Sequence, residues 1–411
     1  MDNKKKFLPI IIGSDENAYG MARAFHEKYG IISTVMCKQV YTATRHSKII
    51  DIHLIDGLDE EEIFIKNIVK IAEEKLKEYE KLILFPCGDY YIEIVAKNKN
   101  LIDKYFCNQF ISYDLLQKFG TKENFYKVCE EYNLPYPKTI ICEKKDRLNI
   151  LDYLSFDFPI AVKANNSNSY DYLHSKFEGK KKFYYISSKE EYIDTINKMN
   201  ESNYNDNLII QEFIPGDDTA ARVLNCFSDN NGKVKLMILG QPVIEEYHPL
   251  NLGNYAAIMT DYNQEIFDQI KKFLEDINYI GFINFDMKFD PKSGEYKLYD
   301  LNPRSGRSSF FVTSAGYNLA EFLVDNCVYN KNLDTVYANT DRLWLTVPKK
   351  IIFKYVENQE VLNRAKRLIK EKKYKYTLLY KKDMNLKRWL RIKLFYHRLV
   401  KNYKKYFFKK I

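Results

Sequence analysis

Asp300-Leu301-Asn302-Pro303-Arg304 is the stretch that decides the fold of this 411-residue chain. Residues 282–289 and 296–301 alternate as strands do, and the Pro- and Gly-containing turn between them predicts a hairpin. Strand alternation puts Asp300 and Asn302 on one face. Asp286 adds a carboxylate on the partner strand, and such hard oxygens suit magnesium. Arg304 follows with a guanidinium fork suited to phosphate oxygens, so the stretch predicts a polyphosphate site.

Two lysines upstream strengthen this prediction. Lys122 opens a helix that stops before Pro135 and Pro137, and Lys163 ends the apolar strand 158–163. A further apolar strand, 208–213, runs into a turn at Gly216. Each piece alone also fits an ordinary solvated strand end or a turn. The prediction therefore depends on all of them occurring in this order.

The N-terminal part alternates strand and helix. Apolar strands are expected at 7–12, 31–36 and 82–85, with helices at 18–29 and 60–79. This order is typical of a parallel sheet wrapped by helices. No GxGxxG motif follows the first strand, so a dinucleotide site is not predicted.

Bulk properties narrow the class of protein. No segment resembles a signal peptide or a membrane span. The seven cysteines are scattered without a CxxC pair, which favours a reduced cytoplasmic protein with no zinc site. The net charge of +9 arises in the tail, because residues 1–360 are acidic overall. That acidic body and the lack of a zinc-finger or RNP-type motif argue against nucleic acid as a partner.

The ordered motifs resemble the ATP-grasp superfamily over roughly residues 1–330. The resemblance implies an α/β plus α+β fold: a Rossmann-like pre-ATP-grasp domain followed by a two-lobed ATP-grasp domain that clamps ATP. A basic helical C-terminal extension follows. The expected boundaries are 1–115 for the first domain, 116–335 for the second (lobes 116–215 and 216–335) and 336–411 for the extension.

The resemblance also implies roles for individual residues. Lys122 and Lys163 resemble the phosphate-binding lysines, Asp218 the acid on the ribose, and Arg304 the arginine on the γ-phosphate. The segment that borders adenine corresponds to Gln211, Glu212, Phe213 and Ile214, and the ligands of two Mg²⁺ ions to Asp286, Asp300 and Asn302. Two features depart from the family: residues 164–170 are polar where a Gly-rich loop is usual, and Asp300 replaces a glutamate.

Residues 302–319 are similar to the D-aspartate ligases of peptidoglycan cross-bridges and to related carboxylate–amine ligases. Arg307, Ser308 and Ser309 offer a guanidinium and hydroxyls that suit an amino-acid carboxylate. Arg307 alternatively is a solvated residue after a turn. His248 lies in a loop and is either near the acceptor amine or simply at the surface.

The resemblance implies an ATP-dependent ligase that forms an amide through an acyl phosphate, adding a D-aspartate-like amino acid to an amine acceptor such as a peptidoglycan precursor. Three alternatives remain open. One is an ATP-grasp ligase for another peptide or metabolite. The others are a non-catalytic nucleotide-binding module and, from the tail alone, a nucleic-acid binder.

The tail carries 19 lysines or arginines between residues 361 and 411, against two acidic residues. Apolar residues recur at helical spacing at Leu386, Trp389, Ile392, Tyr396, Leu399, Tyr403 and Tyr406. This pattern predicts an amphipathic helix with a basic face. The helix either docks on the acidic body or lies on an anionic membrane, which would place the enzyme at the inner face of the membrane.

Overall fold

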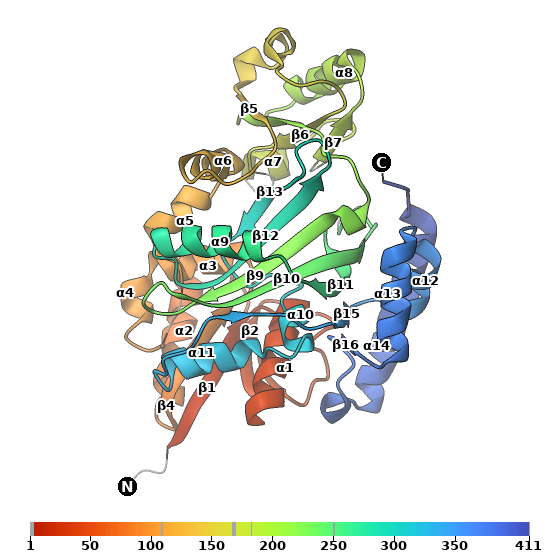
Figure 1. The fold of residues 1–411 in the computed structure, drawn as a ribbon. Coiled ribbons are helices and arrows are strands. Elements are labelled where there is room, and N and C mark those ends of the chain that lie inside the picture. The colour runs from red at the N-terminus through yellow and green to blue at the C-terminus, as the bar shows by residue number, and fades with distance from the viewer. Residues whose placement is uncertain (1–3, 108–109, 167–169, 182, 250, 411) are drawn as a thin grey trace. The chain divides into compact units, whose positions relative to one another are not determined.

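The computed structural model describes residues 4–107, 110–166, 170–181, 183–249 and 251–410, and Figure 1 shows its elements. The chain divides into two compact units. Unit 1 comprises residues 1–113, 217–285 and 302–411, and unit 2 comprises residues 114–216 and 286–301. Strands β12 (Gly281–Asp290) and β13 (Glu295–Asn302) each contribute residues to both units. The fold is mixed α/β.

The N-terminal part of unit 1 holds the parallel sheet that the sequence predicts. Its strands are β1 (Lys5–Ile12), β2 (Ser33–Cys37), β3 (Ile50–Leu54) and β4 (Tyr79–Pro86), in the order β3-β2-β1-β4. All three pairings are parallel. The helices of this part are α1 (Glu16–Tyr29), α2 (Glu61–Lys75), α3 (Asp89–Lys97) and α4 (Lys99–Ile102). Residues 7–12 of β1 are all buried, as expected for a strand covered on both faces.

A second, eight-stranded sheet has the order β13-β12-β9-β10-β11-β15-β16, with β14 paired to β10. Its other strands are β9 (Ala221–Ser228), β10 (Val234–Glu245), β11 (Tyr255–Asp261), β14 (Val336–Tyr337), β15 (Leu343–Leu345) and β16 (Tyr374–Tyr376). Strands β9 and β10 form an antiparallel pair around Gly232, whose φ of 69° suits glycine at this turn.

The remaining helices of unit 1 surround these sheets. They are α9 (Gln264–Asp276), α10 (Phe310–Ser314), α11 (Leu319–Cys327), α12 (Lys349–Tyr355), α13 (Gln359–Lys370) and α14 (Leu386–Tyr406). One apolar core joins distant parts of the sequence, because Phe25, Phe227, Phe311, Trp344 and Ile392 all belong to it. Unit 1 therefore folds around side chains from all three of its segments.

Unit 2 contains an antiparallel four-stranded sheet in the order β5-β8-β6-β7. The strands are β5 (Thr139–Cys142), β6 (Ile160–Ala164), β7 (Phe183–Ile186) and β8 (Leu208–Glu212). Its helices are α6 (Lys122–Glu131), α7 (Tyr170–His174) and α8 (Lys189–Asn200); α5 (Tyr113–Phe119) begins at the boundary. Short 3₁₀ helices occur at Lys144–Asp146 and Asn149–Tyr153 here, and at Asp218–Ala220 and Lys381–Asp383 in unit 1.

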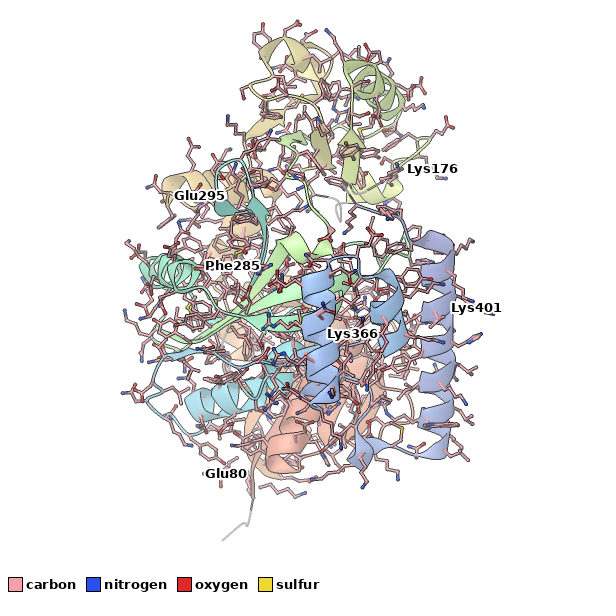
Figure 2. The ribbon with its side chains drawn as sticks, turned by 45° about the vertical axis from the view of Figure 1, so that its right-hand side comes forward. Glu80, Lys176, Phe285, Glu295, Lys366 and Lys401 are labelled. Atoms are coloured by element: carbon pink, nitrogen blue, oxygen red, sulfur yellow. The ribbon has the colours of Figure 1, made fainter. Side chains whose placement is uncertain are left out.

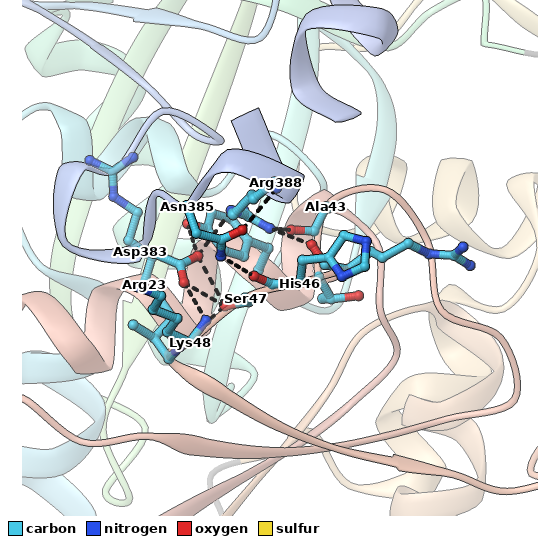
Figure 3. Close-up of polar contacts among 12 residues, drawn as sticks. Arg23, Ala43, His46, Ser47, Lys48, Asp383, Asn385 and Arg388 are labelled. Atoms are coloured by element: carbon cyan, nitrogen blue, oxygen red, sulfur yellow. Dashed lines mark hydrogen bonds and ion pairs between the residues drawn. The ribbon is translucent and has the colours of Figure 1, made fainter. Parts of the chain in front are cut away.

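The C-terminal helix α14 is docked within unit 1, as one of the two alternatives for the tail predicts. Figure 3 shows the polar contacts that hold its start. Arg388 and Asp383 are fully buried, and Nε of Arg388 lies 3.1 Å from Oδ2 of Asp383. Arg388 also donates to the carbonyl of Ala43 at 2.8 Å, while Asp383 accepts from the hydroxyls of Tyr19 and Ser47 at 2.8 and 2.9 Å. The start of α14 is therefore fixed to the N-terminal part of the chain.

Within the described part of the chain, no helix has the length and apolar character needed to cross a membrane.

Candidate active site

In unit 2, the start of α6 is joined to the end of β6. The backbone N–H of Lys122 donates to the carbonyl of Asn165 at 3.2 Å, and the N–H of Glu123 donates to Oδ1 of Asn165 at 3.0 Å. Asn165 directly follows β6, which carries Lys163. The α6 helix starts at Lys122 because the Thr121 hydroxyl caps it by accepting from the N–H of Asn124. These contacts bring the two predicted phosphate lysines into one place.

The two ammonium groups have different partners. Nζ of Lys122 lies 2.8 Å from Oδ1 of Asp300, and Nζ of Lys163 donates to Oε1 of Gln211 at 2.8 Å. Burial, followed by the positive charge of Lys122, lowers the pKa of Lys163 to about 7, against the opposing effect of Asp300. No carboxylate lies within salt-bridge distance of Nζ of Lys163 among the described residues. An anionic ligand would supply the missing negative charge.

The side chain of Gln211 is part of this arrangement. It is buried, accepts from the hydroxyl of Tyr126 at 3.2 Å and donates to the hydroxyl of Thr139 at 2.7 Å. Tyr126 also donates to the backbone carbonyl of Tyr299, one residue before Asp300. The sequence predicts that Gln211 borders adenine. In the structure its side chain accepts a hydrogen bond from Lys163, and its predicted place beside adenine stays a prediction.

The residues after Gln211 lie at the end of β8. Glu212 accepts from Lys297 at 2.5 Å, and Lys297 also pairs with Asp290 at 2.8 Å. The ring of Phe213 packs edge-on against Tyr185. Ile214 is buried. Their predicted contacts with adenine stay a prediction.

Asp286, Asp300 and Asn302 lie on the neighbouring strands β12 and β13. Asp286 and Asp300 belong to unit 2, and Asn302 belongs to unit 1. Both carboxylates are partly buried. Oδ1 of Asn302 accepts from Arg304 at 3.1 Å, and its amide donates to Asn284 at 3.3 Å. The atoms that Asp286, Asp300 and Asn302 offer to a metal are all oxygens. This fits magnesium, an ion that takes few protein ligands. The described residues include no group of three or more His, Cys, Asp or Glu placed to hold a metal.

Arg304 lies in unit 1, in the loop after β13. Its Nε lies 2.5 Å from Oδ1 of Asp89, the first residue of α3. Asp89 is well exposed, whereas the Arg304 side chain is 16% exposed. Because an ion pair with an exposed carboxylate contributes little stability, Arg304 can readily exchange Asp89 for another anion.

Arg307 lies between two buried carboxylates in unit 1. Its guanidinium is 3.3 Å from Oε2 of Glu16 and also contacts Glu246. Burial by itself would lower the pKa of Arg307. The two carboxylates outweigh this effect and raise that pKa. Burial raises the pKa of Glu16, against the pull of Arg307. Ser308 and Ser309, which follow Arg307 in the sequence, are buried. Among the described residues, the Ser309 hydroxyl has no hydrogen-bond partner.

Two further predicted site residues, Asp218 and His248, contact the C-terminal segment. Asp218, predicted to bind ribose, is buried in unit 1 and accepts from the hydroxyl of Tyr247 at 3.0 Å. It also pairs with Lys410 at 2.6 Å. The ring of His248 packs edge-on against Tyr406. Both roles stay predictions.

Sequence reasoning missed Glu16, Glu246 and Tyr126. A usable signal existed for the two glutamates, because Asp15-Glu16 and Glu245-Glu246 each come at or near the end of a long apolar strand. No signal in the sequence distinguishes Tyr126 among the chain's 34 tyrosines.

Comparison with known proteins identifies the family. No protein-family model matches the chain. The chain is 43% identical over 411 residues to the D-aspartate ligase of Enterococcus faecium (strain Aus0004), covering 98% of this chain and 97% of that protein.

Solved structures share the fold at low sequence identity. The biotin carboxylase domain of Hydrogenobacter thermophilus 2-oxoglutarate carboxylase, in complex with MgADP, ADP and bicarbonate, has a TM-score of 0.61 at 14% identity, covering 82% of this chain and 74% of that one. Staphylococcus aureus N5-carboxyaminoimidazole synthetase with ADP has a TM-score of 0.61 at 13% identity and covers 87% of each chain. The two solved structures share the fold of this chain, and the chain belongs to the D-aspartate ligase family of ATP-dependent carboxylate–amine ligases.

Proposed function

We propose that the chain joins D-aspartate to an amine of a peptidoglycan precursor, with conversion of ATP to ADP and phosphate. The observation that carries the proposal is the 43% identity to a D-aspartate ligase over nearly the full length of both chains. Fold similarity alone would not distinguish this activity from other carboxylate chemistry, because one fold hosts many functions. The substrate assignment therefore rests on the relative and on the residues around Arg307.

The nucleotide would be held by the residues that the motifs assign to it. Lys122 and Lys163 present two ammonium groups from one place in unit 2, and Arg304 presents a guanidinium in unit 1. Asp286, Asp300 and Asn302 would hold two magnesium ions through oxygen ligands. Bound magnesium would neutralise charge on the phosphates. The complexes of the two fold relatives with ADP support a nucleotide ligand.

The reaction would proceed in two displacements. First, a carboxylate oxygen of D-aspartate attacks the γ-phosphorus of ATP, and ADP leaves with the electrons of the broken bond. Second, the acceptor nitrogen attacks the acyl carbon and phosphate leaves, while the nitrogen loses a proton. The chain's residues act by position and charge: Arg304 and the two lysines would stabilise the negative charge on the transferred phosphoryl group. His248 is a candidate to accept the proton.

Arg307 would recognise the amino acid. Its fork can bind a carboxylate in two hydrogen bonds. Glu16 and Glu246, which contact Arg307, are buried acids that could in turn receive the ammonium group of the same substrate. Side chains with both signs of charge would select an amino acid, which carries an ammonium group, over a simple dicarboxylate.

The acceptor and the place of action are also part of the proposal. We propose a cytoplasmic enzyme that meets wall precursors at the inner face of the membrane, with the basic helix α14 as the contact. Eight lysines or arginines and no acidic residue occur between Leu386 and Tyr406. Anionic lipids attract such segments.

A coupled assay tests the proposal. The full-length chain is incubated with ATP, magnesium and a precursor that carries a free lysine amine, together with D-aspartate, L-aspartate, D-glutamate or bicarbonate. We expect ADP release and a precursor enlarged by one aspartyl residue, seen by mass spectrometry, with D-aspartate alone. Equal product with L-aspartate, or ADP release driven by bicarbonate, would contradict the substrate assignment. Arg304→Ala is the negative control: loss of product with this variant shows that the product comes from catalysis by this chain.

A further inference from the structure

The orientation of helix α14 is set by its inner face. Arg388, Ile392, Leu399 and Tyr403 are buried, and they lie along one side of the helix. Arg388 takes this side because its partner, Asp383, is buried in the body. The sequence pattern puts Leu386 and Trp389 on the docking side as well, and this is wrong: they are 72% and 44% exposed.

The outer face of α14 carries an apolar stripe. Leu386, Leu390 and Leu394 are spaced four residues apart, so they line up along the helix. Their exposed fractions are 72%, 48% and 64%. Three leucines aligned on one exposed face are unusual, because exposed apolar residues in soluble proteins are normally scattered singly.

Basic side chains border this stripe. Lys387, Arg391, Lys393, Lys401 and Lys405 are all exposed. Figure 2 shows Lys401 on the side of α14 turned away from the rest of unit 1. Nζ of Lys393 lies 4.8 Å from the centre of the Trp389 ring, so this tryptophan is at the edge of the basic surface. The outer face thus combines apolar contact with positive charge.

We infer that this outer face binds an anionic membrane surface, with Leu386, Leu390 and Leu394 inserted among the lipids. Such a surface offers negative headgroups above an apolar layer, which matches a leucine stripe between lysines and arginines. The docked inner face presents the helix already folded, so binding costs little ordering of the chain. The inference deepens the proposed function and rests on it, since membrane-linked wall precursors would be the reason for docking.

Vesicle binding tests the inference. The full-length protein is mixed at low salt with vesicles of phosphatidylglycerol and phosphatidylcholine, or of phosphatidylcholine alone, and bound protein is measured by sedimentation. We expect binding to the anionic vesicles only. Trp389 gives a second readout, because the chain's other tryptophan, Trp344, is buried. Its emission should shift to the blue on binding, and Trp389→Phe should remove the shift.

Two pairs of variants separate the apolar and electrostatic parts. Leu390→Gln/Leu394→Gln should weaken binding, with Leu54→Gln, 64% exposed on β3, as the control. Lys387→Glu/Arg391→Glu should weaken binding at least about 25-fold, since each basic residue contributes about fivefold. The control is Lys66→Glu/Lys70→Glu on α2, which changes the net charge equally and lies at exposed positions.

The outcomes are distinct. No binding of the full-length protein to anionic vesicles overturns the inference and leaves an acidic protein as the partner of this face. Unchanged binding of the leucine variant also overturns it, because attraction would then be electrostatic alone. The ligase assay with a soluble nucleotide-linked acceptor is run on the same variants. Failure of that assay in the wild type counts against the proposed function and does not affect the vesicle result.

Discussion

Nucleotide binding should be coupled to a proton on Lys163. Burial and the neighbouring charge of Lys122 lower the pKa of Lys163 to about 7. A phosphate ligand favours the charged form of the lysine and so raises this pKa. Above pH 7 the free enzyme must therefore take up a proton to bind. Between the two pKa values, affinity should fall by up to about tenfold for each pH unit.

Calorimetric titration with MgADP between pH 6 and 9 measures this dependence. Repeating it in buffers of different ionisation enthalpy gives the number of protons taken up. The nucleotide itself titrates in this range, so the decisive comparison is with Lys163→Met, which should bind weakly and lack the additional pH dependence. Lys127→Met is the matched control, because Lys127 lies in the same unit on α6, is 65% exposed and pairs only with Glu123 among the described residues.

Lys122→Met sharpens the test. It removes the positive charge that lowers the pKa of Lys163, so the pH dependence should move to higher pH. If the wild type and Lys163→Met show the same pH dependence and the same proton uptake, Lys163 does not change its protonation on binding, and its assignment as a phosphate ligand loses its electrostatic support.

Three further predictions concern the metal, the amino acid and the C-terminal helix. Asp300→Asn should abolish turnover with little loss of stability, because magnesium would lose a charged ligand; wild-type rates at limiting magnesium would contradict this. Arg307→Lys should raise the KM for the amino acid and hardly change that for ATP, because lysine lacks the two-pronged fork; equal changes in both would place Arg307 at the nucleotide or in packing alone. Asp383→Ala should lower the free energy of unfolding, followed by Trp344 fluorescence, by about 3–5 kcal/mol, because it leaves Arg388 buried and unpaired. The control Asp276→Ala breaks an exposed pair with Lys272 and should lower the free energy of unfolding by at most about 1 kcal/mol. A loss at Asp383 as small as that of the control would refute the argument from a buried, unpaired Arg388.

Arg307 shows where sequence reasoning about the site ended. The pattern Arg-Ser-Ser predicts a carboxylate cradle, but the carboxylates that contact Arg307 come from Glu16 and Glu246, far away in the sequence. Gln211 is similar, because nothing near it in the sequence indicates that its amide contacts Lys163 and Tyr126. Long-range contacts of this kind leave no periodic trace in the sequence.

The sequence by itself determined the local elements and the family. Hydrophobic alternation and turn residues are local properties, so the strands around the Asp300 motif, the parallel N-terminal sheet and the helix from Leu386 could all be predicted from them. Only the tertiary structure decided what these elements contact. A single buried carboxylate, Asp383, turns Arg388 inward and leaves Leu386 facing out. Helical periodicity can place a side chain on a face but cannot identify its partner, because that partner comes from another part of the chain.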